Sequence, residues 1–221
     1  MPAARPTPGA ASAADEALAR GVAALGAPDT AMPVLLAYLD ELVRWSRAYN
    51  LTGIRDPLRM VSHHLLDSLA VLPYCAPPLI DVGSGAGLPG LVLAIARRDW
   101  PVTVLDAAGK KARFLRHVAR HLALDNVEVI ETRVEVYSPS RPAATVISRA
   151  FAELGEFLRL TLHLSGTSGR WLAMKGKLRR HELEAVPPAM SVQAVHPLQI
   201  PGLAAERHLV VAVRASGSQR A

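Results

Sequence analysis

A glycine-rich segment directly after a short apolar run is the part of this sequence that most clearly predicts a ligand. Residues 79–82 are apolar apart from one acid and lead into four glycines within residues 83–90. An apolar run that ends in glycines and is followed by a helical pattern (residues 91–98) predicts a strand, a tight loop and a helix. Glycine lets the backbone approach a ligand closely, and the start of a helix offers free N–H groups. The segment therefore predicts a site for a nucleotide-type cofactor.

Two cofactors compete for this site. Residues 85–90 fit the G-x-G-x-x-G pattern of dinucleotide sites, which would favour NAD. However, Asp81 stands on the strand two residues before the first glycine. A carboxylate there would repel a pyrophosphate, whereas it can reach the charged amino-acid portion of S-adenosylmethionine (SAM). A second strand ends in Asp106, which suits the ribose of either cofactor. Asp81 thus favours SAM, and the predicted contacts are Asp81, Gly85, Gly87 and Asp106.

Alternating strand and helix patterns from residue 79 onward predict a parallel sheet. The predicted strands are 79–83, 102–106, 127–131, 144–148 and 170–175, and the predicted helices are 88–98, 109–123, 151–164 and 177–186. Residues 191–200 and 207–213 predict an antiparallel hairpin around Pro201-Gly202. Together these elements predict an α/β, Rossmann-like SAM-dependent methyltransferase fold. Its sheet would have seven strands, mostly parallel, with the hairpin at the C-terminal end.

The N-terminal third of the chain has a helical pattern. Helices are predicted at 15–25, from 32 to about 49, and at 57–72, the last introduced by Asp56 as N-cap and Pro57 in the first turn. We expect residues 1–14, which are rich in alanine and proline, to form a disordered tail. We expect residues 15–75 to form a helical cap and residues 76–221 to form the SAM-binding domain, with cap and sheet packed as one compact unit.

The composition limits the partners and the compartment. Half of the 221 residues are apolar, but no run reaches the roughly 18–20 residues of a membrane helix. Cys75 is the single cysteine, so we expect no internal disulfide and a reduced, cytoplasmic setting. We also expect the protein to be a monomer. The net charge of +6 favours phosphate-rich partners. The most basic run is either a solvated helix face or a phosphate-binding surface, and it contains Lys110, Lys111, Arg113, Arg116 and Arg120.

The residues at the carboxyl ends of the predicted strands narrow the reaction. The fourth strand ends in Ser148-Arg149-Ala150-Phe151, not in the Asn/Asp-Pro-Pro-aromatic sequence with which many methyltransferases hold an exocyclic amine. Cys75 lies in a proline-rich connector, an unsuitable place for the nucleophile of pyrimidine C5 methylation. The acids are too spread for a catalytic metal. A target that is already nucleophilic, such as N7 of guanine, needs mainly alignment with the methyl group.

Several polar residues allow two interpretations. Arg149 and Lys175, at the ends of the fourth and fifth strands, are either surface cations or contacts with the cofactor or target, and they are the candidates for catalytic residues. His64, Asp67 and Ser68 share one helix face, because they are spaced i, i+3 and i+4, and they suit a polar network. We do not expect zinc, because the two adjacent histidines point apart and no thiolate accompanies them.

These motifs, taken in order, resemble those of the ribosomal RNA small subunit methyltransferase G family, also called the glucose-inhibited division protein B family. The resemblance runs from about Leu39 to Arg214. It rests on Tyr49-Asn50-Leu51-Thr52, His64-Leu65-Leu66-Asp67-Ser68, residues 80–90, Leu105-Asp106, residues 109–115, Arg133-Val134-Glu135, Ser148-Arg149-Ala150-Phe151, Lys175-Gly176 and Glu206-Arg207-His208. The number and order of these motifs make the resemblance specific.

The resemblance implies a SAM-dependent 16S rRNA (guanine-N7)-methyltransferase that acts on one guanine of the small ribosomal subunit. The implied cofactor contacts are Gly83, Leu88, Val134, Glu135 and Arg149. The candidate RNA contacts are Asn50, His64, Lys110, Lys111 and Lys175. Neither a metal nor a membrane is expected as a partner.

Two other functions stay open at this point. An NAD-dependent oxidoreductase would need a proton donor, for which His64 is the placed candidate. A non-catalytic RNA-binding or assembly factor could retain the fold, although the glycine loop with Asp106 and Glu135 argues against a lost site. If the first function holds, the sequence leaves open whether the substrate is naked 16S rRNA, an assembly intermediate or the complete subunit.

Overall fold

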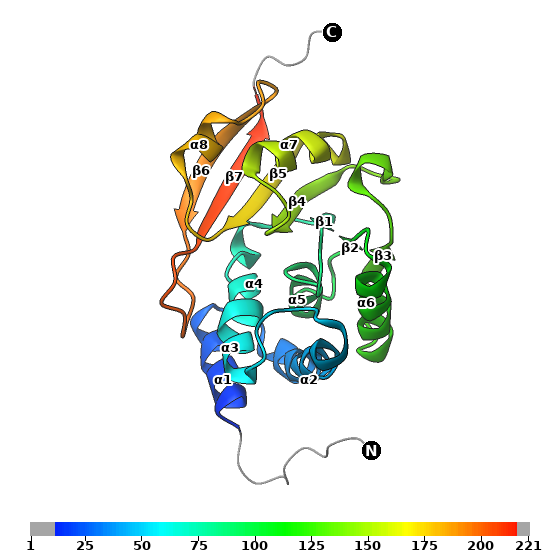
Figure 1. Cartoon of the computed structure of the whole chain (residues 1–221), viewed down its shortest axis with the longest axis vertical. Coiled ribbons are helices and arrows are strands. Elements are labelled where there is room, and N and C mark those ends of the chain that lie inside the picture. The colour runs from blue at the N-terminus through cyan, green and yellow to red at the C-terminus, as the bar shows by residue number, and fades with distance from the viewer. Residues whose placement is uncertain (1–11, 216–221) are drawn as a thin grey trace.

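A single seven-stranded sheet forms the centre of the computed structural model, which describes residues 12–215 (Figure 1). Its strands are β1 (Leu79–Val82), β2 (Val102–Leu105), β3 (Val127–Ile130), β4 (Ala143–Arg149), β5 (Ser165–Lys175), β6 (Met190–Pro197) and β7 (His208–Arg214). They lie in the order β3-β2-β1-β4-β5-β7-β6. The first five strands are parallel, and β7 is antiparallel to both β5 and β6. The predicted fold class is therefore confirmed.

Strand β5 begins five residues earlier than the sequence predicted. Its pairing with β4 shifts register between Ala143 and Thr145, which face Ser165 and Arg170 respectively. The residues between them therefore form an irregular insertion in the strand. The apolar pattern begins only after that insertion, at Trp171, which is why the prediction started late.

Four helices connect or follow the parallel strands: α5 (Gly90–Ala96), α6 (Gly109–His121), α7 (Leu154–Thr161) and α8 (Arg180–Glu184). Short 3-10 turns follow β3, at Val134–Val136, and α7, at Leu162–Leu164. Helix α7 begins three residues later than predicted, because its N-cap residue, Glu153, has an extended backbone (φ −63°, ψ 154°). Ala150 before it has a left-handed conformation (φ 55°). Residues 150–153 form a separate turn instead, and this turn becomes part of the site.

The N-terminal helices are α1 (Ala13–Ala24), α2 (Met32–Tyr49), α3 (Pro57–Met60) and α4 (Asp67–Leu69), with short turns at Asp29–Ala31 and Leu72–Tyr74. The predicted helix 57–72 is interrupted by a π-helical turn, Val61–Leu66. Helix α1 begins two residues early and so takes in the end of the predicted tail, because the Ser12 side chain accepts a hydrogen bond from the Asp15 N–H. The rest of that predicted tail, residues 1–11, lies outside the described residues.

The sheet buries a different set of apolar side chains on each face. One face packs with the N-terminal helices, α5 and α6, in a cluster that joins Leu18, Leu35 and Leu91 to Val104 of β2. The other face packs with α7 and α8 around Trp171. Figure 1 shows α7 and α8 beside strands β4–β7, with the N-terminal helices gathered at the opposite end of the molecule. The N-terminal helices share one core with the sheet. These helices therefore keep the carboxyl edge of the sheet in a fixed position.

Candidate cofactor and active site

The loop after β1 has a backbone that requires glycine. Gly83, Gly85 and Gly87 have φ values of 68°, 59° and 89°, which glycine adopts without steric cost. The Gly83 and Ser84 N–H groups both donate to the Leu105 carbonyl, at 2.8 and 3.1 Å, and so tie the loop to β2. A Cβ atom built on Gly83 would lie well inside 3.0 Å of the Phe151 ring. The loop is thus compact, and its first glycine lies directly against Phe151.

Asp81 lies beneath this loop. It is fully buried on β1, and its Oδ2 accepts a hydrogen bond from the N–H of Gly90, the first residue of α5, at 2.8 Å. Its Oδ1 has no partner among the described residues. Burial raises the pKa of this carboxyl from 3.8 to about 7, although the Gly90 N–H and Arg149 act in the opposite direction. Contact between Asp81 and the amino-acid portion of SAM stays a prediction. In this structure the Asp81 carboxylate also caps the start of α5.

The raised pKa of Asp81 predicts a pH-dependent stability. The folded protein holds this proton more tightly than the unfolded chain, so the stability it confers is complete below about pH 4 and is lost as the pH rises through 7. Between pH 6 and 8 this loss is about 1.4 kcal/mol. We expect Asp81→Asn to remove this fall in the free energy of unfolding, measured by urea denaturation across that range.

The exposed Asp99 supplies the control for this pH prediction. Its hydrogen bond from Arg97 lowers its pKa, so Asp99→Asn should alter the pH dependence only in the acid range. Equal pH slopes in the wild type and Asp81→Asn would show that Asp81 does not titrate near neutrality.

Asp106 joins the loop to the start of α6. Its Oδ2 accepts from the Gly85 N–H and its Oδ1 from the Ala108 N–H, each at 2.9 Å, and Lys111 Nζ lies 3.6 Å from Oδ2. Each carboxylate oxygen can accept two hydrogen bonds. The acid therefore keeps acceptor capacity for the predicted ribose hydroxyls while it fixes the loop.

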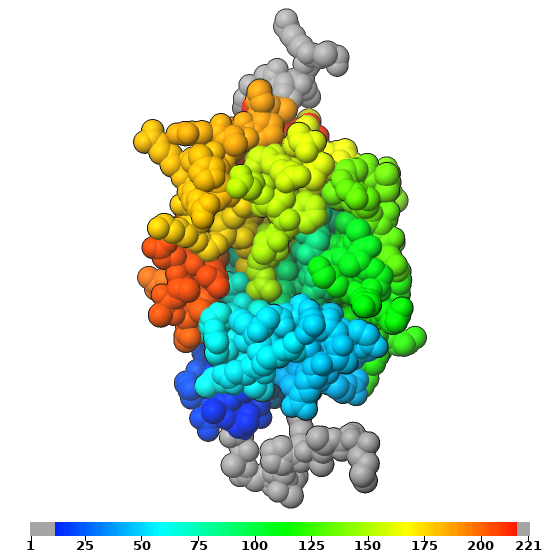
Figure 2. Space-filling view, viewed as in Figure 1, coloured from blue at the N-terminus to red at the C-terminus, as the bar shows by residue number. Residues whose placement is uncertain are grey.

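A cavity of about 420 Å³ lies at the carboxyl ends of β1, β2 and β4. The predicted cofactor contacts Gly83, Asp106, Val134 and Glu135 line it together. Another cavity, of about 360 Å³, lies at the opposite edge, where the same strands begin. Ligands of open α/β sheets bind at the carboxyl ends, so the first cavity is the candidate site. In Figure 2 it opens in the recess between α6 and the segment that leads into α7.

The remaining predicted contacts do not line this cavity. Gly85, Gly87 and Leu88 build the loop behind it; the Gly87 and Leu88 N–H groups donate to the Ser84 carbonyl. Arg149 points to the other side of β4. Its Nη1 donates to the His63 carbonyl at 2.9 Å and to Asp67 Oδ2 at 3.1 Å. The role of Arg149 in cofactor binding stays a prediction.

Asp67 is the centre of a charged cluster that the sequence suggested only in part. It is buried, and it receives a second arginine, Arg207, whose Nε donates to Oδ1 at 3.0 Å. The cluster connects the start of α4, the end of β4 and the start of β7. Arg207 was missed as a site residue, although the motif Glu206-Arg207-His208 was part of the family resemblance.

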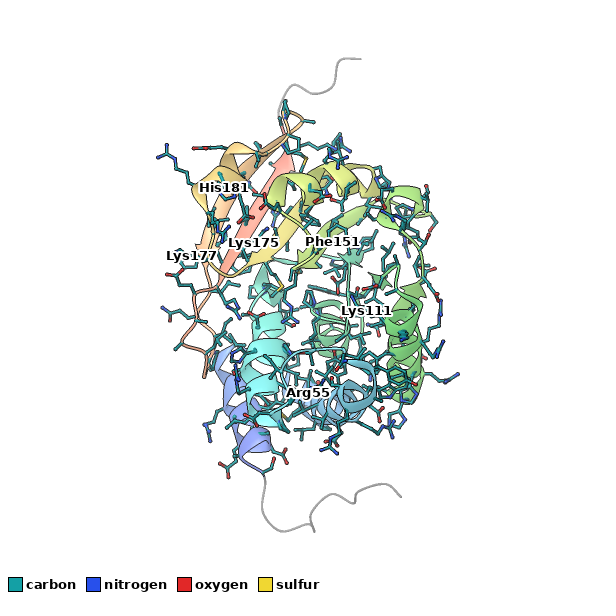
Figure 3. All side chains as sticks on the ribbon, viewed as in Figure 1. Arg55, Lys111, Phe151, Lys175, Lys177 and His181 are labelled. Carbon is teal, nitrogen blue, oxygen red and sulfur yellow. The ribbon has the colours of Figure 1, made fainter. Side chains whose placement is uncertain are left out.

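Phe151 is a second residue that the sequence interpretation missed. Its ring is 36% exposed at the cavity, next to Gly83, and it follows the left-handed Ala150. Lys175 Nζ donates to the Ala152 carbonyl at 3.0 Å and to Glu182 Oε2 at 2.6 Å. Lys175 therefore supports the turn that carries Phe151 (Figure 3). The sequence does contain a signal for this position, namely an aromatic residue soon after the end of β4.

The candidate RNA contacts lie in different surroundings. Lys110 is exposed at the start of α6, and Lys111 lines the cofactor cavity. Lys175 has a side chain that is only 15% exposed and is paired with Glu182. Asn50 ends α2 in a left-handed conformation and accepts a hydrogen bond from Arg55. Asn50 and Lys110 are the exposed candidates, whereas Lys111 and Lys175 are partly buried.

His64 lies inside the molecule. Its Nε2 is 2.7 Å from Thr52 Oγ1, and its Nδ1 has no partner among the described residues. Burial and then the charge of Arg149 lower its pKa to about 4, so the ring is neutral at pH 7. Contact between His64 and RNA stays a prediction that would require the chain around the ring to move.

The structure also bears on the reactivity of Cys75, on metal binding and on membrane-spanning helices. Burial raises the pKa of the Cys75 thiol to about 12, which is unsuited to a nucleophile. Between residues 12 and 215, no three His, Cys, Asp or Glu side chains are placed to share a metal ion. No helix in the same range is long and apolar enough to cross a membrane.

The strand order, the glycine loop after β1 and the acid after β2 define a SAM-dependent methyltransferase fold. A SAM-dependent methyltransferase from Aquifex aeolicus superimposes with a TM-score of 0.55 over 75% of this chain and 97% of that one, at 16% identity. The glycopeptide N-methyltransferase MtfA in complex with S-adenosylhomocysteine gives a TM-score of 0.56 at 10% identity, over 69% of this chain and 87% of that one. These structures show the fold, and the choice of SAM over NAD rests on the methyltransferase family to which the chain belongs.

The chain belongs to the rRNA small subunit methyltransferase G (GidB) family, whose model matches residues 31–210. Relatives that bear the name ribosomal RNA small subunit methyltransferase G include proteins from Methylobacillus flagellatus and Neisseria gonorrhoeae. The first is 52% identical over 80% of this chain and 85% of the relative. The second is 49% identical over 89% of this chain and 96% of the relative. The resemblance described from the sequence motifs is confirmed.

Proposed function

We propose that this protein transfers the methyl group of SAM to N7 of one guanine in 16S rRNA. The observation that carries the proposal is the cavity at the carboxyl edge of the sheet, where the glycine loop and Asp106 meet. Family membership supports rRNA of the small subunit as the substrate. The choice of N7 follows from the family resemblance and from the type of groups that line the cavity.

The residues present fit SAM. Asp106 would hold the ribose hydroxyls, Val134 and Glu135 would border the adenine, and the loop that begins at Gly83 would receive the amino-acid portion. The unpartnered Oδ1 of buried Asp81 adds a hydrogen-bonding group beneath that loop. When bound, SAM supplies an electrophilic methyl group on a sulfonium. The protein supplies the positions of the groups around it.

The cavity lining suits a reaction without proton transfer. N7 of guanine has an exposed lone pair and no proton to lose. Neither histidine nor cysteine is among the described residues that line the cavity. The ring of Phe151 offers a partly exposed face on which a flat base can stack. The protein's contribution is then orientation and exclusion of water, which supply a large part of the rate when the reacting atoms are aligned.

The proposal also covers the cell compartment, the oligomeric state and the domain organisation. We place the protein in the bacterial cytoplasm as a monomer that acts on the small ribosomal subunit. Residues 15–75 act as a helical cap over the edge of the methyltransferase domain 76–221, supported by the core that they share.

The test uses SAM with a labelled methyl group. The protein is incubated with small subunits from cells that lack its gene, and in parallel with naked 16S rRNA, and the labelled nucleoside is identified after digestion. One labelled 7-methylguanosine is expected, and the better substrate shows whether assembly is required. Subunits from wild-type cells are the control and should accept no label. Label on another base would overturn the N7 assignment, and no label despite SAM binding would overturn the enzymatic proposal.

A further inference from the structure

A basic groove lies between α2 and α6, outside the cofactor cavity. We name it the α2–α6 groove; it is lined by Trp45, Arg113, Arg116, His117 and Arg120, with Gly109 and Glu131 at its edge. Its volume is about 420 Å³. Figure 1 shows these two helices side by side at the end of the molecule opposite α8. The groove is a candidate binding surface because of the kind of side chains that meet there.

Positive charge dominates this groove. Arg113, Arg116 and Arg120 are all exposed on one face of α6. The single acid at its edge, Glu131, is already bonded to Arg116 at 2.7 Å. Arg113 and Arg120 have no hydrogen bond or ion pair to any described residue in this structure. Two arginines without a protein partner, on a rigid helix, fit an anionic ligand such as a phosphate.

Trp45 and His117 supply the aromatic rings that line the groove, and Tyr49 lies beside Trp45 outside that lining. The Trp45 ring lies 5.0 Å from the His117 ring and 5.1 Å from the Tyr49 ring, centroid to centroid. Tyr49 is 42% exposed. Arginines beside partly exposed aromatic rings are the combination that binds unpaired nucleotides, because the rings stack with bases while the cations contact phosphates.

A buried acid holds the floor of the groove in place. Glu41 is 5% exposed, and its Oε2 contacts His117 Nε2 at 2.8 Å, while its Oε1 lies 3.6 Å from His121 Nε2. Arg44 bonds to the same carboxylate. These contacts fix the ring of His117 against Trp45, so the groove has a defined shape in the free protein.

The groove lies next to the candidate active site along α6. Helix α6 begins at Gly109 on the edge of the groove, and two residues later Lys111 lines the cofactor cavity. Figure 3 shows Lys111 at the end of α6 that faces the recess. A strand of RNA that lies in the groove would therefore reach the cavity within about one helical turn of α6.

From these observations we infer that the α2–α6 groove binds an unpaired segment of the rRNA substrate next to the methylated guanine. Arg113 and Arg120 contact its phosphates, and Tyr49 with Trp45 stacks on a base. The inference rests on the proposed function and adds the surface that holds the substrate.

The test compares two double variants with the same loss of charge. Arg113→Gln/Arg120→Gln removes the two unpartnered arginines, and Arg141→Gln/Arg170→Gln is the control, because both of its arginines are exposed and lie near the opposite edge of the sheet. Equilibrium binding to unmethylated small subunits and to 16S rRNA is measured from 50 to 300 mM salt. We expect the groove variant to bind roughly 10- to 100-fold more weakly, with the salt slope reduced by about 1.4. The control should match the wild type.

A second variant separates stacking from charge. Tyr49→Ala should weaken binding about fivefold or more and leave the salt slope unchanged, because no cation is removed. SAM binding by calorimetry verifies that each variant is folded. If the groove variant binds as tightly as the control, the inference is wrong.

Photocrosslinking from Arg120→p-benzoylphenylalanine on small subunits identifies the partner. Crosslinks to 16S rRNA support the inference, and crosslinks only to a ribosomal protein overturn it. Wild-type methyl transfer is recorded in parallel. Absence of transfer would refute the proposed function, whereas transfer to guanine with an unaffected groove variant would refute only this inference.

Discussion

Gly83→Ala is expected to lower the affinity for SAM by about 100-fold. A φ of 68° costs an L-residue about 1–2 kcal/mol, but this cost is present with and without SAM and lowers stability. The affinity falls because the new Cβ would lie within 3.0 Å of the Phe151 ring. The ring would have to move, and the space next to it is the cofactor cavity. A cost of about 3 kcal/mol in the bound state corresponds to the stated factor. Isothermal titration calorimetry with SAM measures it directly.

Gly26 supplies the matched control. Its φ is 63°, almost the same as that of Gly83, but a Cβ there would meet no atom within 4 Å. Gly26→Ala should therefore lower the free energy of unfolding by about 1–2 kcal/mol and leave the affinity for SAM unchanged. In Gly83→Ala/Phe151→Ala the clash is removed and the backbone strain is kept, so part of the affinity should return. Wild-type affinity in Gly83→Ala would refute the placement of the cofactor.

The parts of the site that the sequence predicted are those set by local pattern. The run 79–82 followed by glycines predicts β1 and its loop, and the rule that ligands bind at the carboxyl ends of parallel strands brings Asp106 and Glu135 to one edge. These residues could be predicted without knowing which distant segments contact them in the fold. The mostly parallel, seven-stranded sheet with its terminal hairpin follows from the same alternation of elements and was predicted correctly.

The parts that were missed depend on contacts between distant segments. Arg149 and Lys175 both stand at strand ends, but one turns to Asp67 and the other to Ala152 and Glu182. Nothing in the neighbouring sequence indicates these directions. The π-helical turn at Val61–Leu66 is likewise invisible in an apolar pattern that fits an ordinary helix. His63, in this turn, uses its carbonyl to accept the hydrogen bond from Arg149.

The buried Asp67 ties together three segments that are far apart in the chain. Its carboxylate bonds to Arg149 at the end of β4 and to Arg207 at the start of β7, while its own backbone begins α4. The arginine side chains are 21% and 22% exposed, so water screens them only in part. The turn with Ala150 and Phe151 directly follows Arg149 and borders the cavity. Loss of this carboxylate is therefore expected to affect both stability and the site.

Asp67→Ala should lower the free energy of unfolding by about 3 kcal/mol, because removal of one partner from a buried ion pair leaves the others uncompensated. Methyl transfer should fall roughly tenfold, about 1.4 kcal/mol in the barrier, since the end of β4 loses its anchor. The control is Asp99→Asn, which breaks an ion pair whose carboxylate is 65% exposed and should lower the free energy of unfolding far less than Asp67→Ala does. A double-mutant cycle with Arg207→Met separates coupling from general damage. If Asp67 and Arg207 act together, the two losses combine to much less than their sum. Fully additive losses would show that the two side chains do not stabilise the protein through each other.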